Sequence, residues 1–200
     1  MELYKVELCR GSRGCPRAVG DTNELEGKII NVFEKTGFVE KRQKQLGANF
    51  KQHNVFKVGL AGCANCCSQP QIKDFALIAK ALPIFNNDLC NLCGVCVEAC
   101  KEKALKIEGG NLAINEDKCL GCGDCKRTCP VAAVKGEDVK WRLMVGGKLG
   151  RHPQLAQELK DVYDREGLLY LEKAIAMILR ASDPHKRFAQ LLEEENISFS

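Results

Sequence analysis

Thirteen cysteines fall at spacings that few kinds of protein use. Cys9 and Cys15 are separated by five residues and Cys63 and Cys67 by three, so these two pairs can meet only when the chain folds. Four thiolates that converge on one point are the ligand set of an iron–sulfur cubane or of a structural zinc ion. Zinc ribbons favour short gaps on both sides. The five-residue gap therefore favours an iron–sulfur site.

Eight further cysteines form two blocks with gaps of two, two and three residues. This spacing is typical of bacterial two-cluster ferredoxins, in which the fourth cysteine of each block binds the other cluster. One expected [4Fe–4S] cluster is held by Cys90, Cys93, Cys96 and Cys129. The other is held by Cys100, Cys119, Cys122 and Cys125. Zinc binding is a much less favoured alternative, because two consecutive blocks of this spacing are a ferredoxin feature.

The two blocks define an expected inserted ferredoxin domain at residues 87–136. Lys101 stands where the first block would usually have a proline, which alters the turn but removes no ligand. Residues 104–115 predict a β-hairpin between the blocks. The remaining chain, residues 1–86 and 137–200, is expected to form a single surrounding domain.

Composition limits the classes of protein to which the chain can belong. Its 200 residues are 45% hydrophobic, enough for one domain and one small inserted module. We expect a reducing, cytoplasmic location without a membrane span, because no long apolar stretch or signal peptide is visible. The thiols are then expected to hold metal, and oxygen-labile clusters suit an anaerobic cell. The net charge of +4 gives little reason to expect nucleic acid as a partner.

Predicted strands deliver the first two cysteine pairs. Residues 2–8 alternate apolar and charged side chains and predict a strand that ends at Cys9. Residues 54–62 predict a strand that presents Cys63 at its tip. Residues 69–82 continue as another strand and turn. The loop after Cys9 carries Arg10, Arg13 and Arg17, whose guanidinium groups can bind carboxylates, although at least one of the three can simply solvate the loop.

Helical patterns occupy other parts of the chain. A helix capped by Asp21 and ended by Gly37 is expected, because apolar residues recur there at helical spacing. The basic stretch 41–51 is interpreted as a solvated face.

The C-terminal part predicts one strand followed by three helices. Residues 139–145 alternate as a strand before a glycine-rich turn. Pro153 is expected to start a helix that bears Leu155, Leu159 and Val162, and a second helix runs from about residue 166 to 181. The third helix is expected from Asp183, as cap, to Glu195.

Three stretches resemble siroheme-dependent sulfite and nitrite reductases, in that family's order: CRGSRGCPRAV, FKVGLAGCANCCSQPQIKDFALI and RLMVGGKLGRHP. The resemblance implies an α/β fold, a siroheme-type sulfite/nitrite reductase domain with a mixed sheet and helices, into which the ferredoxin domain is inserted. It spans nearly the whole chain but not the repeat that precedes this region in full-length relatives. The chain is thus similar to small dissimilatory sulfite reductase-like proteins.

The resemblance also implies roles for individual residues. Cys67 is expected to bind the cubane and to bridge to the siroheme iron, and Asn65 matches the family's GCxNxC pattern. Cys66 is left over and is interpreted as a buried structural thiol. The expected siroheme or oxyanion contacts are Arg10, Arg13, Lys73, Gly146, Gly147, Lys148 and Arg151. Glycines let a backbone approach the ring, and cations neutralise its carboxylates.

Taken together, these patterns predict a redox enzyme with three [4Fe–4S] clusters and siroheme. Electrons from a soluble donor would enter the ferredoxin clusters, pass to the cubane on Cys9, Cys15, Cys63 and Cys67, and reduce a small oxyanion, sulfite rather than nitrite. A homo-oligomer or a partner subunit would complete the site. The alternative is an iron–sulfur electron-transfer protein that reduces no substrate itself. A redox sensor is a weaker third possibility.

Overall fold

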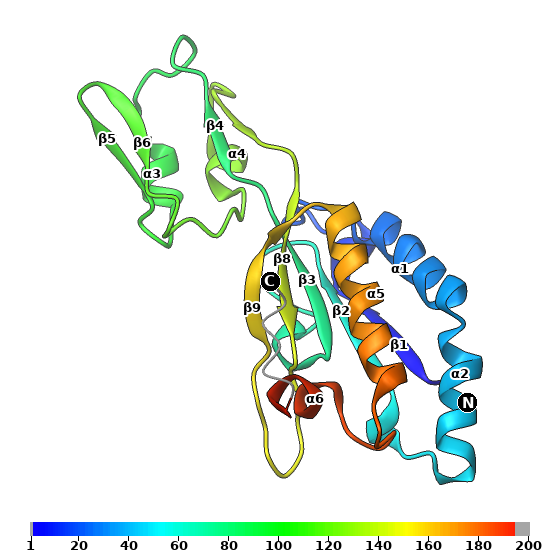
Figure 1. The fold of residues 1–200 in the computed structure, drawn as a ribbon. Helices are drawn as coiled ribbons and strands as arrows, with labels where there is room; N and C mark the ends of the chain where they lie inside the picture. The colour runs from blue at the N-terminus through cyan, green and yellow to red at the C-terminus, as the bar shows by residue number, and fades with distance from the viewer. Residues whose placement is uncertain (1, 195–200) are drawn as a thin grey trace.

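A five-stranded mixed sheet forms the centre of the main domain (Figure 1). The computed structural model describes residues 2–194. The strand order is β1 (Tyr4–Leu8), β2 (Phe56–Ala61), β3 (Phe75–Lys80), β8 (Lys140–Val145) and β9 (Gln157–Val162). The first three strands are parallel, whereas β8 and β9 run antiparallel to their neighbours. The predicted mixed sheet with helices is therefore confirmed.

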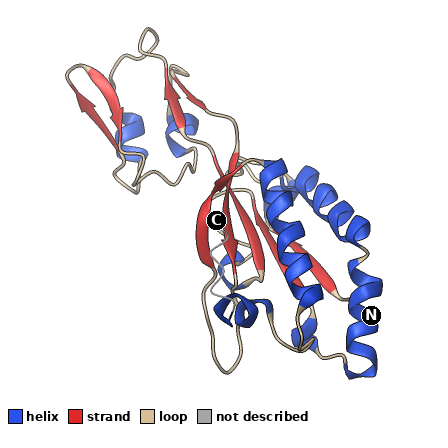
Figure 2. Cartoon of the chain, in the orientation of Figure 1, coloured by secondary structure: helices blue, strands red, loops and turns tan. Residues whose placement is uncertain are grey.

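Helices cover one face of this sheet (Figure 2). α1 (Thr22–Thr36) and α5 (Asp164–Arg180) pack side by side across it, and α2 (Phe38–Leu46) and α6 (Phe188–Glu194) extend the layer. The predicted start and end of α1 are confirmed. Asp21 accepts a hydrogen bond from the backbone N–H of Asn23 at 2.8 Å, and Gly37 ends the helix at φ 60°.

The core lies between these helices and the sheet. It contains a cluster of aromatic rings in which Tyr4 stacks on Phe33 with 3.9 Å between the ring centroids. The largest fully buried side chains of this core are Phe33, Phe38, Phe75, Phe188, Leu3, Leu25, Ile29, Leu60, Leu77, Leu143 and Leu171. Burial of this apolar area is the main term that stabilises the fold.

A loop rather than a helix covers the other face of the sheet. Small apolar side chains form a second cluster there, made of Ala61, Ala76, Ile78, Met144 and Ala156. The connection from β2 to β3, which includes the 3-10 helix η4 (Pro70–Ile72), runs back along this face. It is fixed to the chain before β9 by a hydrogen bond from Ala156 N–H to the Gln71 carbonyl at 2.7 Å.

Residues 83–136 form a separate lobe at one end of the sheet (Figure 1). The lobe has two small antiparallel sheets and two short helices: β4 (Pro83–Phe85) with β7 (Val134–Gly136), β5 (Leu105–Glu108) with β6 (Asn111–Ile114), α3 (Val95–Ala99) and α4 (Asp124–Thr128). The predicted hairpin is β5–β6. Equivalent hydrogen bonds, each 2.8 Å, join Asn86 N–H to the Ala133 carbonyl and Asn115 N–H to the Ala104 carbonyl. The lobe is thus an internal repeat.

The helix predicted from Pro153 is wrong, because this segment forms β9. Leu155, Leu159 and Val162 do recur at helical spacing, but Leu155 is 70% exposed, Leu159 is only partly buried against the core, and Val162 alone is a buried member of it. Pairing with β8, through a bulge at Leu143 and Met144, decides the structure of this segment. Tertiary pairing overrides the local pattern.

Two other expectations are corrected. The stretch interpreted as a solvated face is exposed at Lys41, Lys44 and Lys51, but it also contributes most of α2, and there Arg42 is 2% exposed and donates to the Pro184 carbonyl at 2.6 Å. The third C-terminal helix does not start at Asp183, whose side chain instead accepts from His185 N–H in a turn. It starts at Phe188 as α6, and its expected last residue, Glu195, lies outside the described residues. Three further 3-10 turns are η1 (Arg10–Arg13), η2 (Gly47–Asn49) and η3 (Gln52–Asn54).

Within residues 2–194, no helix has the length and apolar character needed to cross a bilayer.

Gly147 is a position at which the fold excludes a side chain. A Cβ there would lie 2.6 Å from the Gln71 carbonyl oxygen and 2.7 Å from that of Lys73. We expect Gly147→Ala to destabilise the protein by about 1–3 kcal/mol, since backbone cannot move as a flexible side chain can. The control is Gly27→Ala at an exposed position of α1, where a Cβ meets nothing within 4 Å. There we expect the free energy of unfolding to increase by about 0.5–1 kcal/mol. Urea unfolding under anaerobic conditions measures both, and equal midpoints would contradict the packing argument.

Asp74 gives the fold a pH dependence. Its carboxyl group is 4% exposed, and burial raises its pKa to about 6, although it accepts a hydrogen bond from Lys57 N–H at 2.9 Å. From about pH 4 to 6 the folded state then binds more protons than the unfolded state, so stability falls as pH rises, by about 3 kcal/mol in all. Asp74→Asn keeps an acceptor without the charge. As the pH rises from about 4 to 6, the free energy of unfolding of the variant minus that of wild type should increase, and above about pH 6 it should stay constant. A difference that does not change with pH would refute the assignment.

Candidate functional site

Parallel pairing brings the first two cysteine pairs to the same end of the sheet. β1 and β2 are neighbours, with Leu8 opposite Leu60, so the chain leaves both strands at one edge and reaches Cys9 and Cys63 there. Cys9 N–H donates to the Leu60 carbonyl at 3.0 Å. The Cys9 sulfur in turn accepts from Gly11 N–H and Gly62 N–H, each at 3.2 Å. Hydrogen bonds to cysteine sulfur are one means of tuning iron–sulfur potentials.

The four cysteines predicted for the first cluster lie together. Burial raises the pKa of the Cys63 thiol, and the neighbouring thiols of Cys9, Cys15 and Cys67 raise it further. Cys9 and Cys63 are buried, whereas Cys67 is exposed. The set therefore has a desolvated side and an open side. We call these four cysteines the first set.

Cys66 points elsewhere. Its backbone takes a positive φ of 53°, and its partly buried side chain packs against the apolar cluster on the loop-covered face of the sheet. Burial raises the pKa of this thiol, while a hydrogen bond with Gln71 and the charge of Arg142 oppose the rise. The structure thus places Cys66 in the apolar packing beneath the loop, in agreement with its interpretation as a structural thiol.

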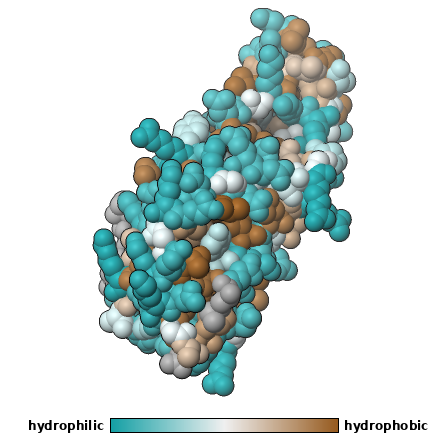
Figure 3. Space-filling view, turned by 90° about the vertical axis from the view of Figure 1, so that its right-hand side faces the viewer, coloured by the Kyte–Doolittle hydropathy of each residue, from teal (hydrophilic) through white to brown (hydrophobic). Residues whose placement is uncertain are grey.

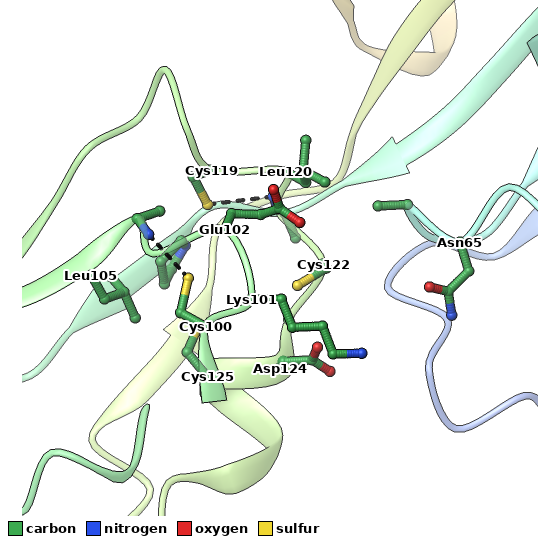
Figure 4. A pocket seen from close by; sticks show the side chains of 16 residues that line it. Asn65, Cys100, Lys101, Glu102, Leu105, Cys119, Leu120, Cys122, Asp124 and Cys125 are labelled. Carbon is green, nitrogen blue, oxygen red and sulfur yellow. Dashed lines mark hydrogen bonds between the residues drawn. The ribbon is translucent and has the colours of Figure 1, made fainter. Parts of the chain in front are cut away.

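The eight cysteines of the lobe line two cavities. The outer cavity is lined by Cys90, Cys93, Cys96 and Cys129. The inner cavity is lined by Cys100, Cys119, Cys122 and Cys125 (Figure 4). Each cavity thus combines three cysteines of one block with the fourth of the other. This is the exchange that the ferredoxin spacing predicts.

The repeat also holds the fourth cysteine of each block in the same way. The sulfur of Cys100 accepts from Ala104 N–H and that of Cys129 from Ala133 N–H, both at 3.2 Å. In each case the residue before the donor has a positive φ of 50° or 53°. The bond after Cys100 forms although Lys101 replaces the proline of the other block. The departure from the usual motif therefore leaves the cysteine geometry intact.

The inner cavity faces the loop that carries the first set. Ala64 and Asn65 line it from the main domain, and they lie between Cys63 and Cys67 in the sequence. The lobe is held there by a hydrogen bond from Ala81 N–H to the Gly121 carbonyl at 3.1 Å and by an exposed ion pair between Arg17 and Asp124 at 3.5 Å. In space, the inner cysteine set of the lobe thus lies between the outer set and the first set of the main domain.

Two predicted basic contact residues already have acidic partners. The ammonium of Lys73 is buried and lies 2.6 Å from a carboxylate oxygen of Glu7. Burial alone would raise the pKa of Glu7, but the hydrogen bond and charge of Lys73 lower it overall. Lys148 lies 3.3 Å from a carboxylate oxygen of Glu193. Neither lysine is a free cation in this structure. Glu7 was not among the predicted site residues, although strand alternation places it on the same sheet face as Lys5.

The glycine turn lies away from the first set. β8 is antiparallel to β3, so Gly146 and Gly147 follow at the sheet end opposite Cys9 and Cys63. Gly147 packs against the backbone of residues 71–73, and Gly146, at φ 79°, packs against Leu192. Arg151 is exposed beyond this turn. The structure therefore does not bring these three residues, or Lys148, to the first set.

Arg10 and Arg13, by contrast, lie beside the first set. Both are exposed in η1, between Cys9 and Cys15, and Asn65 is exposed between Cys63 and Cys67. These side chains and the open side of Cys67 suit an anionic, carboxylate-rich ring such as siroheme. The residues of the glycine turn do not extend that surface within this chain.

The cysteine sets suit cubanes because each thiolate of a cubane binds a different iron atom. Among residues 2–194, no three histidine, cysteine or acidic side chains are close enough to hold one metal ion together.

Comparisons with known proteins identify the family. The family model described as "Nitrite and sulphite reductase 4Fe-4S domain" matches residues 2–197. The chain is 32% identical over 180 residues to a coenzyme F420-dependent sulfite reductase of Methanocaldococcus jannaschii, a match that covers 90% of this chain and 28% of the relative. It is 30% identical over 100 residues to a subunit of the anaerobic sulfite reductase of Salmonella typhimurium, covering 50% of this chain and 25% of the relative. The chain thus spans less than a third of the length of these relatives.

Solved structures share the fold. Dissimilatory sulfite reductase I (DsrI) superposes with a TM-score of 0.60 at 17% identity, covering 94% of this chain and 49% of that one. The NirA protein of Mycobacterium tuberculosis superposes with a TM-score of 0.51 at 14% identity, covering 94% and 25%. The resemblance drawn from the cysteine motifs is thus confirmed, and the chain belongs to the nitrite and sulphite reductase 4Fe-4S domain family.

Proposed function

We propose that this protein is a sulfite or nitrite reductase-type oxidoreductase that holds three [4Fe–4S] clusters. One observation carries the proposal: three groups of four cysteines, each drawn from separated segments of the chain, lie around three places in the fold. Each group matches the Cys₄ ligand set of a cubane. The clusters would supply one-electron steps.

The order of the three cysteine sets suggests the direction of electron flow. The outer cavity is lined only by residues of the lobe, whereas the inner cavity is shared with the loop of the first set. Cys96 of the outer set lies near enough to Cys125 of the inner set to contribute to the rise of its pKa to about 11, after burial and closer thiols. We infer a path from outer to inner to first set.

The outer cavity also offers a place for a soluble electron donor. Leu92 and Val131 line it and are each 38% exposed, and Leu89 nearby is 52% exposed. An exposed apolar rim around a redox centre suits a brief encounter with a small carrier protein. A reducing cytoplasm is the compartment in which such clusters and such a donor would persist.

Siroheme bound through Cys67 would supply the iron on which a small oxyanion is reduced. In this chain Arg10, Arg13 and Asn65 lie where they can bind anionic groups beside Cys67. Lys73 can contribute only if it exchanges its present partner, Glu7. Lys148 pairs with Glu193 and lies at the opposite end of the sheet, so it does not reach Cys67 within this chain. Sulfite is the preferred substrate because the named relatives are sulfite reductases.

A second candidate is an electron-transfer protein or partner subunit without turnover of its own. It is favoured by the distance of the glycine turn from the first set, which leaves part of the expected ring surface unformed in this chain. The Salmonella relative is itself named as a subunit. A second chain would then complete the oxyanion site.

Turnover of the anaerobically purified holoprotein separates these candidates. Iron, acid-labile sulfide and extractable tetrapyrrole are measured first, followed by steady-state reduction of sulfite and nitrite with an artificial donor. Siroheme with turnover supports the reductase. Reducible clusters without tetrapyrrole or turnover would support the carrier, and a protein without cubane iron would refute both.

Adjacent cysteines provide a matched test of the first set. Cys67→Ser should lower the cubane iron content or abolish magnetic coupling between cluster and siroheme signals, because an alkoxide replaces a soft thiolate ligand. Cys66→Ser makes the same chemical change one residue away, in apolar packing, and should leave both readouts unchanged. Iron analysis and electron paramagnetic resonance measure the outcome. The reverse pattern would assign the ligand to Cys66 instead.

A further inference from the structure

β1 leaves one edge of the sheet open. It is the first strand in the sheet order, and its only strand partner within residues 2–194 is β2. Cys9 N–H donates to the Leu60 carbonyl, and Phe56 N–H donates to the Leu3 carbonyl. A parallel ladder uses alternate residues, so the backbone groups of Tyr4, Val6 and Leu8 point away from β2. Across the described residues they find no backbone partner.

The edge lacks some of the features that prevent strands from pairing, and its two charged residues, Lys5 and Glu7, have opposite signs. β1 contains no proline or bulge, and its side chains are mostly half-buried. Unprotected edges of this kind are templates for another strand.

The sequence of β1 is complementary to itself in the antiparallel direction. In a pair of copies centred on Val6, Tyr4 of one copy lies opposite Leu8 of the other, and Lys5 lies opposite Glu7. Tyr4, Val6 and Leu8 then form hydrogen-bonded pairs, which matches the direction of their free groups. Lys5 and Glu7 fall at the non-hydrogen-bonded positions, where side chains are closest. The two-fold axis therefore produces two contacts between Lys5 of one copy and Glu7 of the other.

The surroundings of the edge suit this arrangement. An open groove along β1 is lined by Tyr4, Val6, Glu26, Ile30 and Val39, so apolar side chains of α1 and α2 flank it. The side of the molecule that carries these helices shows apolar patches between hydrophilic residues (Figure 3). Tyr4, Val6 and Leu8 of a second copy would meet this apolar flank. Lys5, with a side chain 52% exposed, would meet the second copy's Glu7 on the other sheet face.

We propose that β1 is a homodimerisation edge, at which two copies of this chain pair their β1 strands antiparallel about a two-fold axis through Val6. The two sheets then form one sheet continuous across the dimer, and the interface is isologous. The charge pattern selects a second copy over an unrelated strand, because reversal of one strand regenerates the same sequence of charges. None of these residues is expected to ligate a cluster, so the dimer does not depend on the cluster assignments, although Glu7 also pairs with Lys73.

Charge exchange tests the register. Sedimentation velocity of the anaerobic holoprotein should show a concentration-dependent dimer. Lys5→Glu should weaken it, on the order of tenfold or more in dissociation constant, by placing like charges opposite each other. Glu7→Lys should weaken it in the same way, but it also places a cation beside the buried Lys73, so each variant that carries it is compared only after circular dichroism and cluster absorbance show that it is folded. The double variant Lys5→Glu/Glu7→Lys should restore the dimer. Lys44→Glu makes the same change in charge at an exposed position of α2 and should leave the dimer dissociation constant unchanged.

Two further measurements test the backbone pairing. Val6→Pro removes an N–H that points away from β2, so the fold should survive, as judged by circular dichroism and cluster absorbance, while the dimer is lost. In a mixture of unlabelled and ¹⁵N-labelled protein, zero-length carbodiimide cross-linking should join Lys5 of one copy to Glu7 of the other.

Several outcomes would overturn the proposal. They are a wild-type protein that stays monomeric at all concentrations, a dimer that persists in a folded Val6→Pro variant, and a charge exchange that fails to restore assembly. A mixed-isotope Lys5–Glu7 cross-link that is absent from a stable dimer would also place the interface elsewhere.

Discussion

The parallel pairing of β1 with β2 is the constraint on which the candidate centre depends. Parallel strands end at the same edge of a sheet, so Cys9 and Cys63 reach one place although more than fifty residues separate them. The bond from Gly62 N–H to the Cys9 sulfur crosses between the two loops. Without this register the two cysteine pairs would remain separate motifs. The sheet thus sets the geometry of the first set before any metal arrives.

The lobe also brings together cysteines that are distant in sequence, but through an internal repeat rather than through parallel strand pairing. Its two halves repeat the same turn, in which a positive φ precedes an N–H that donates to the fourth cysteine. Such a repeat can exchange its fourth cysteines only if its halves face each other, and contacts between α3 and α4 join them. The close packing of Gly121 against the backbone of Ala81 then fixes the inner half against the main domain. Local repetition and one tight junction therefore order all three sets.

The cysteine spacing predicted the site more accurately than hydrophobic periodicity predicted the elements. Spacing encodes a ligand geometry that a cluster imposes, so the groupings of the lobe agree with the two cavities. Periodicity failed at residues 153–163, where an i, i+4, i+7 pattern of apolar residues belongs to an edge strand paired with β8. The run of basic residues at 41–51 did not predict the burial of Arg42, because a charged residue can be buried when a carbonyl distant in sequence accepts its hydrogen bond. The partners of Lys73 and Lys148 could not be predicted, because only the tertiary fold places Glu7 and Glu193 beside them.

The covered face of the sheet explains how cluster loading and folding are coupled. The loop after Cys67 is tied along this face by Ala156 N–H to Gln71 and by Gly147 N–H to Lys73, so the thiols are positioned by ordinary backbone contacts. Burial raises the pKa values of Cys63, Cys96, Cys119 and Cys125, which means that the folded chain resists forming the thiolates that iron requires. Iron binding offsets this cost and releases protons. Where these thiols bind iron, cluster loading should therefore depend on pH, because a proton leaves as each thiolate forms.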